Sequence, residues 1–124
     1  MTAEPIDGQR LEGLAASFGG GAEGWSFVRE LIDTFLEDAP TQLATLRNAV
    51  EQAEATEARR AAHTLKSNGA TFCAGSFADV CRELEAATDR GQLDGTTAGL
   101  LEQAELEWER ARDALERAGP GPAG

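Results

Sequence analysis

The stretch ARRAAHTLKSNGATF, residues 58–72, decides the fold because it has the pattern of one amphipathic helix. With about 100° between successive residues, its small and apolar side chains lie within about 60° of one direction on a helical wheel. A helix with such a stripe buries it against other helices. The residues that we expect on the buried side are Ala58, Ala61, Ala62, Leu65, Gly69 and Phe72.

The chain on both sides of this stretch also favours helix nearly everywhere. Tyrosine is absent, and alanine, leucine, glutamate and arginine, all with high helix propensity, dominate. Glycine and proline mark where helices end or begin. They predict helices over residues 7–18, 23–38, 40–53, 55–72, 76–89 and 94–118.

These segments predict an all-α fold, an up-and-down four-helix bundle with one or two additional short N-terminal helices. We expect a single domain at residues 1–118 and a disordered tail at residues 119–124. We also expect Phe27 to face the core, and Pro40 to start a new helix, since proline is well tolerated at the first helical position.

The charge of the chain excludes several classes of partner. Twenty-two acidic and eleven basic residues give a formal net charge of −11, which opposes nucleic-acid phosphates and anionic membrane surfaces. No apolar run reaches the 18 or so residues that a membrane span needs. We therefore predict a cytoplasmic protein that binds neither nucleic acid nor membrane.

The two cysteines, Cys73 and Cys81, are eight residues apart. On one helix their Cα atoms would be about 12 Å apart, too far for a disulfide, unless a break in the helix brought them closer. Free cysteines are among the most buried residues. We expect two small buried thiols, in keeping with a reducing compartment.

His63 and Lys66 are the only histidine and the only lysine of the chain. On the wheel His63 lies about 140° from Ala58, so its imidazole should point largely into solvent. Its neighbours one helical turn away are Arg59, Arg60, Lys66 and Ser67. Cations beside an imidazole disfavour its charged form. This arrangement suits the acceptance of a phosphoryl group, because phosphoryl transfer depends mainly on positioning and electrostatics.

Spacing alone leaves other interpretations of this histidine open. A single histidine on an exposed helix face is usually an ordinary surface residue. One histidine and two thiols without CxxC or HxxxH spacing do not make a zinc site, so we expect no bound metal. An exposed helix face offers no pocket for hydrolase chemistry, and the chain lacks a GxxxxGK[ST] loop for nucleotide binding.

Two motifs, AAHTLKSNGATF at residues 61–72 and VCRELE at residues 80–85, resemble the signature of the histidine-containing phosphotransfer (Hpt) domain family. That signature is AHxLKG, a glycine about ten residues after the histidine, and CxxLE on the next helix. FLEDAPTQLATLRNAV, residues 35–50, resembles the helical pair that precedes it. The resemblance covers residues 7–117 and implies a phosphorelay intermediate.

The resemblance also implies roles for single residues. His63 matches the histidine that accepts a phosphoryl group from a receiver-domain phospho-aspartate, and Lys66 the lysine that balances the phosphoryl charge. Ser67 occupies the small position beside the ring. Glu85 matches a position whose Gln or Glu hydrogen-bonds the imidazole in some members; by accepting from Nδ1–H it would leave Nε2 free to attack. Arg59 and Arg60 are expected to support the site.

The partners that the resemblance implies are receiver domains of response regulators or of a hybrid histidine kinase, with the protein itself a monomer. No cofactor is expected on this chain, and Mg²⁺ is expected in the acidic pocket of the receiver. Without ATP-binding or autokinase parts, the chain is a phosphotransfer protein rather than an enzyme. The alternatives are a helical adaptor in which His63 is incidental, or the Hpt domain of a larger hybrid or chemotaxis-type histidine kinase.

The sequence departs from the family pattern at Cys73, where the family usually has glycine, and Gly75 follows two residues later. A left-handed residue commonly ends a helix, and cysteine is sterically disfavoured in that conformation. We therefore expect the helix break to move to Gly75.

Overall fold

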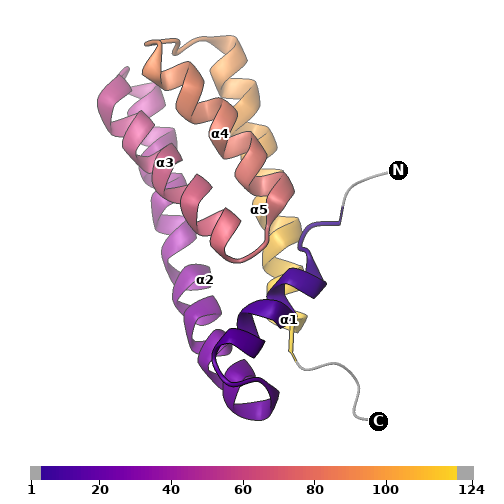
Figure 1. Cartoon of the computed structure of the whole chain (residues 1–124). Coiled ribbons are helices and arrows are strands. Elements are labelled where there is room, and N and C mark those ends of the chain that lie inside the picture. Colours follow the sequence, from indigo (N-terminus) through magenta and orange to yellow (C-terminus); the bar gives the residue numbers. More distant parts are fainter. Residues whose placement is uncertain (1–3, 120–124) are drawn as a thin grey trace.

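A computed structural model describes residues 4–119 and contains five helices (Figure 1). They are α1 (Gly8–Ser17), α2 (Gly21–Glu51), α3 (Ala55–Thr71), α4 (Gly75–Asp89) and α5 (Gly95–Arg117). Helices α2 to α5 run alternately up and down as a four-helix bundle, and the short α1 packs against the N-terminal part of α2. The predicted fold class is confirmed. Apart from Gly119, the predicted tail lies outside the described residues.

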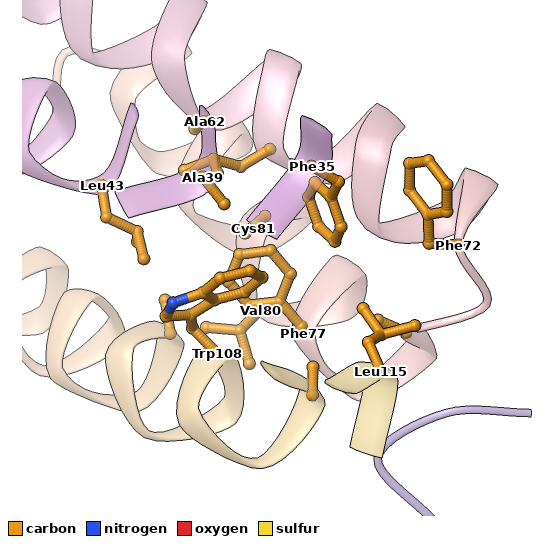
Figure 2. Close-up of a cluster of buried hydrophobic side chains, with 14 of the residues drawn as sticks. Phe35, Ala39, Leu43, Ala62, Phe72, Phe77, Val80, Cys81, Trp108 and Leu115 are labelled. Carbon is orange, nitrogen blue, oxygen red and sulfur yellow. The ribbon is translucent and has the colours of Figure 1, made fainter. Parts of the chain in front are cut away.

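Aromatic side chains from three helices and a turn meet at the centre of the bundle (Figure 2). The ring of Phe35 on α2 stacks on Phe72 at a centroid distance of 4.9 Å. Trp108 on α5 lies 5.2 Å from Phe35 and 5.6 Å from Phe77 on α4. Aromatic pairs at such distances add to the hydrophobic stabilisation of a core. This cluster joins α2, α4, α5 and the turn that follows α3 in one core.

Helix α3 buries the predicted side. The five hydrophobic residues of the stripe are 0 to 7% exposed, and Gly69 is buried as well. A Cβ atom at Gly69 would lie 3.1 Å from Phe77 Cδ2 and 3.3 Å from the Cβ of Ala78. The absence of a side chain at Gly69 therefore lets α4 approach α3 closely.

The expected helix break at Pro40 is wrong. Helix α2 is 31 residues long and continues through Pro40, although the proline has no N–H to donate to the carbonyl of Leu36. The reason lies in the stripe of buried residues on α2, which does not shift at the proline: Phe35, Ala39, Leu43 and Leu46. Packing of this continuous stripe outweighs the local preference of proline, whose own ring is exposed.

The expected burial of Phe27 is also wrong. Phe27 is 46% exposed, and its ring lies 4.4 Å from that of Phe18, which is 42% exposed. The two phenylalanines cover each other at the junction of α1 and α2. Phe27 is the chain neighbour of Val28, and only Val28 is buried in the core.

Replacing Gly24 with alanine is expected to destabilise the fold by about 1–3 kcal/mol. Its Cβ would press on the backbone carbonyl oxygen of Ala15 and lie 3.1 Å from the carbonyl carbon, so α1 and α2 would have to separate. Urea unfolding measures the change. Gly13→Ala is the matched control, because nothing lies within 4 Å of its added Cβ. It should leave stability unchanged or raise it by up to about 1 kcal/mol; equal losses in both variants would contradict the close packing.

Candidate functional site

The side chain of His63 is 55% exposed on the outer side of α3. Its chain neighbour Ala62 and Leu65, two residues further on, are fully buried. Because their packing fixes the rotation of α3, the imidazole is directed outward, as the wheel predicted. The side chain can thus be reached by a second protein without any opening of the fold.

Glu85 on α4 lies opposite His63 and contacts two groups at once. Its Oε2 atom is 2.6 Å from Nδ1 of His63, and its Oε1 atom is 2.6 Å from Nζ of Lys66. The side chain of Glu85 is 19% exposed and that of Lys66 is 31% exposed. One carboxylate therefore holds both the imidazole and the ammonium group, with one oxygen for each.

The contact at Nδ1 determines how the imidazole can react. An ionised carboxylate only accepts hydrogen bonds, so the ring proton of a neutral His63 lies on Nδ1 and is donated to Glu85. The lone pair is then on Nε2. The imidazole thus carries its nucleophilic nitrogen, Nε2, at an exposed position, and the contact of Nδ1 with Glu85 fixes this tautomer.

The carboxyl group of Glu85 has a lowered pKa, mainly because Lys66 donates a hydrogen bond to it, and partial burial only in part opposes this; His63 adds to the lowering. The pKa of this carboxyl is thus lower in the folded protein than in the unfolded chain, where glutamate has a pKa of about 4.3. The ionised carboxylate therefore stabilises the fold at pH values above about 4.3. This stabilisation is lost as the pH falls through the folded-state pKa.

Glu85→Gln should therefore be less stable than the wild type at pH 7, with the difference shrinking below about pH 4 as the wild-type carboxyl is protonated. Urea unfolding at both pH values tests this. Glu83→Gln, at an exposed position of the same helix, is the control and should show little loss at either pH. A Glu85→Gln difference that does not change with pH would contradict the assignment of the ion pair.

The remaining predicted residues lie around the site with partners of their own. Arg59 Nε is 3.8 Å from Asp89 on α4, and Arg60 is 3.5 Å from Glu57. The cations expected around His63 are thus each compensated by a carboxylate, which a wheel of α3 alone does not reveal. Ser67 is exposed one turn after His63.

Sequence reasoning missed Arg82 on α4. Its guanidinium pairs with Asp79, and it lines a hollow of about 320 Å³ together with Arg59, Glu85, Ala86 and Asp89. The signal that could have found it is the antiparallel register of α3 and α4. Once Glu85 faces His63, the residue one turn before Glu85 must also lie beside α3.

The expectation that the break moves to Gly75 is wrong, because Cys73 itself takes the left-handed conformation with φ +62°. Two hydrogen bonds hold it there, from Cys73 N–H to the carbonyl of Ala70 (3.1 Å) and from Ala74 N–H to that of Gly69 (2.8 Å). This is the Schellman pattern at a helix end. The carbonyl of Cys73 also accepts from Asp7 N–H at 2.8 Å.

Cys73 and Cys81 are free and buried, as predicted. Burial raises the pKa of the Cys81 thiol to about 12 and also raises that of Cys73. Both thiols are therefore protonated near neutral pH. Within residues 4–119, no helix combines the length and the apolar character that a bilayer crossing requires.

Comparison with known proteins identifies the arrangement. The Hpt domain family matches residues 30–118. A solved structure, the histidine-containing phosphotransfer protein B (HptB) of Pseudomonas aeruginosa PAO1, is similar with a TM-score of 0.82 and 28% identity. The match covers 94% of this chain and 95% of the other. No curated protein matches the sequence. The chain belongs to the Hpt domain family, whose members carry phosphoryl groups in phosphorelays.

Proposed function

We propose that Nε2 of His63 accepts a phosphoryl group from a receiver-domain phospho-aspartate and that the chain passes it on to the aspartate of a response regulator. The observation that carries this proposal is the 2.6 Å contact between Glu85 and Nδ1 of His63. It leaves Nε2 as the nucleophile on an exposed face.

The transfer needs no proton to leave the imidazole. As the N–P bond forms at Nε2, the P–O bond to the aspartate breaks, and the aspartate carboxylate leaves with the electron pair. Nδ1–H remains in place, so the ring gains positive charge, which the carboxylate of Glu85 stabilises. The reverse sequence delivers the phosphoryl group to the next receiver.

Lys66 supplies positive charge beside the reacting nitrogen. It lies one turn from His63 on α3, and in the unphosphorylated protein its Nζ is bound to Oε1 of Glu85. An arriving phosphoryl group places negative charge on its three peripheral oxygens. We propose that Lys66 then interacts with one of these oxygens. Arg59 and Arg60, on the same helix, add positive charge around the site, and the small side chain of Ser67 leaves room for the receiver.

Hpt domains are phosphoryl carriers that interact with receiver domains. For this chain we propose a monomeric carrier in the cytoplasm, without kinase activity of its own and without a resident cofactor. Mg²⁺ would be held by carboxylates of the receiver, since oxygen ligands are those that Mg²⁺ prefers.

The test is to mix the protein with each phosphorylated receiver domain of the source organism and follow the label. Label that appears on the protein and is labile to acid but stable to alkali is the expected result. Identification of the phosphorylated nitrogen as Nε2 would support the role of Glu85. A complete set of receivers that leaves the protein unlabelled would overturn the proposal. Label that comes instead from ATP through a separate kinase domain, without a receiver, would indicate the chemotaxis-type alternative.

A further inference from the structure

Helix α3 differs in charge from the rest of the molecule. It carries three cations, Arg59, Arg60 and Lys66, against one carboxylate. Helices α2, α4 and α5 carry more carboxylates than cations, six against two, four against one and six against three. In a chain of net charge −11, α3 is thus the one of these four helices with more cations than carboxylates.

The hollow lined by Arg59, Arg82, Glu85, Ala86 and Asp89, which we call the Arg59–Arg82 hollow, adjoins the site. Glu85 belongs to both, because its carboxylate contacts His63 while its side chain forms part of the wall. The two guanidinium groups come from the neighbouring helices α3 and α4. A partner that docks over His63 therefore comes close to this hollow.

Both arginines are free to exchange partners. Arg82 and Asp79 are 63% and 66% exposed, and Arg59 and Asp89 are 45% and 72% exposed with 3.8 Å between the nearest charged atoms. Exposed ion pairs of this kind contribute only about 0–1 kcal/mol. Guanidinium groups bind carboxylates in a planar, bidentate geometry, with two parallel hydrogen bonds. An incoming carboxylate can therefore replace either internal partner at small cost.

We infer that Arg59 and Arg82 together bind a carboxylate side chain that the receiver presents beside its phosphorylated aspartate, and that this contact selects among receivers. The inference rests on the proposed function, since it assumes that a receiver docks over His63. A pocket that holds Mg²⁺ is built from carboxylates, so the edge of the receiver that approaches α3 is acidic. Charge pairing across such an edge governs association and partner choice.

The experiment uses the receiver that labels the wild-type protein fastest, with transfer rate measured against receiver concentration. Arg82→Glu and Arg59→Glu should each raise the half-saturating receiver concentration about tenfold, and the effect should shrink at high salt. The maximal rate should stay unchanged in Arg82→Glu, because Arg82 is not among the residues assigned to the phosphoryl group. Arg112→Glu on α5 is the matched control. Arg112 also has an i,i+3 carboxylate partner, Glu109, and its replacement should leave transfer unchanged.

Direct phosphorylation of His63 by the small donor phosphoramidate separates this inference from the proposed function. It should proceed equally in the wild type, in Arg82→Glu and in Arg112→Glu, because no receiver is involved. Wild-type concentration dependence in both Arg82→Glu and Arg59→Glu would overturn the inference and leave the proposed function standing. Restoration of Arg82→Glu by replacement of one receiver carboxylate with lysine would identify the residue that enters the hollow.

Discussion

The His63→Gln protein is expected to take up no acid-labile label from any phosphorylated receiver. His63 is the only histidine of the chain, so no second imidazole can take over. Glutamine keeps an amide that can donate to Glu85 but has no nucleophilic nitrogen. The loss should therefore be complete rather than partial. Transfer from labelled receiver, followed on acid-free gels over a range of times, measures it.

The same variant should remain folded. The imidazole is more than half exposed, and substitutions at exposed positions usually change stability by less than about 0.5 kcal/mol. Thermal unfolding followed by circular dichroism provides the control. Label that persists on folded His63→Gln protein would place the phosphorylation site elsewhere, and a helical adaptor would then be the better description.

Lys66→Gln is expected to slow transfer about 10- to 100-fold. Loss of one fixed donor in a buried oxyanion site costs about 100- to 1,000-fold, and the effect should be smaller here because Lys66 is partly exposed. The glutamine amide can still donate to Glu85, which limits structural disturbance. Rapid-quench measurements at saturating receiver give the rate of the transfer step itself.

Lys66→Arg is the informative comparison for this prediction. Arginine keeps the charge but changes the reach and the number of donors, so transfer should fall less than in Lys66→Gln. Equal rates for Lys66→Gln and the wild type would show that the phosphoryl group does not use the ammonium. A raised half-saturating receiver concentration with an unchanged maximal rate would instead make Lys66 a docking residue.

The buried side of α3 could be predicted because it depends on local periodicity alone. Helical period and residue size place the stripe from Ala58 to Phe72 inward, and the structure agrees. The same wheel gave the exposure of His63 and its proximity to Lys66. These features require one helix and no knowledge of its neighbours.

Features that depend on other helices were not predictable in this way. Pro40 lies within α2 because the buried stripe continues past it, and Cys73 is left-handed because its turn is fixed by hydrogen bonds to Ala70 and Gly69. At Pro40 tertiary packing overrides a local preference. At Cys73 the two hydrogen bonds lie within the end of α3, and a tertiary one from Asp7 N–H to the Cys73 carbonyl adds to them. The contact of Glu85 with His63 likewise needed the register of α3 against α4, which entered only through the family resemblance.

The shared carboxylate of Glu85 has a consequence for how this site can vary. Both of its oxygens are occupied, one by His63 and one by Lys66, so the orientation of the ring and the position of the ammonium are not independent. Effects of substitutions at Lys66 and Glu85 will therefore not add. Loss of Glu85 would remove the hydrogen-bond acceptor of Lys66 and the acceptor that fixes the tautomer of His63. Positions 63, 66 and 85 therefore constrain one another, because a change at position 85 alters the contacts of both other residues.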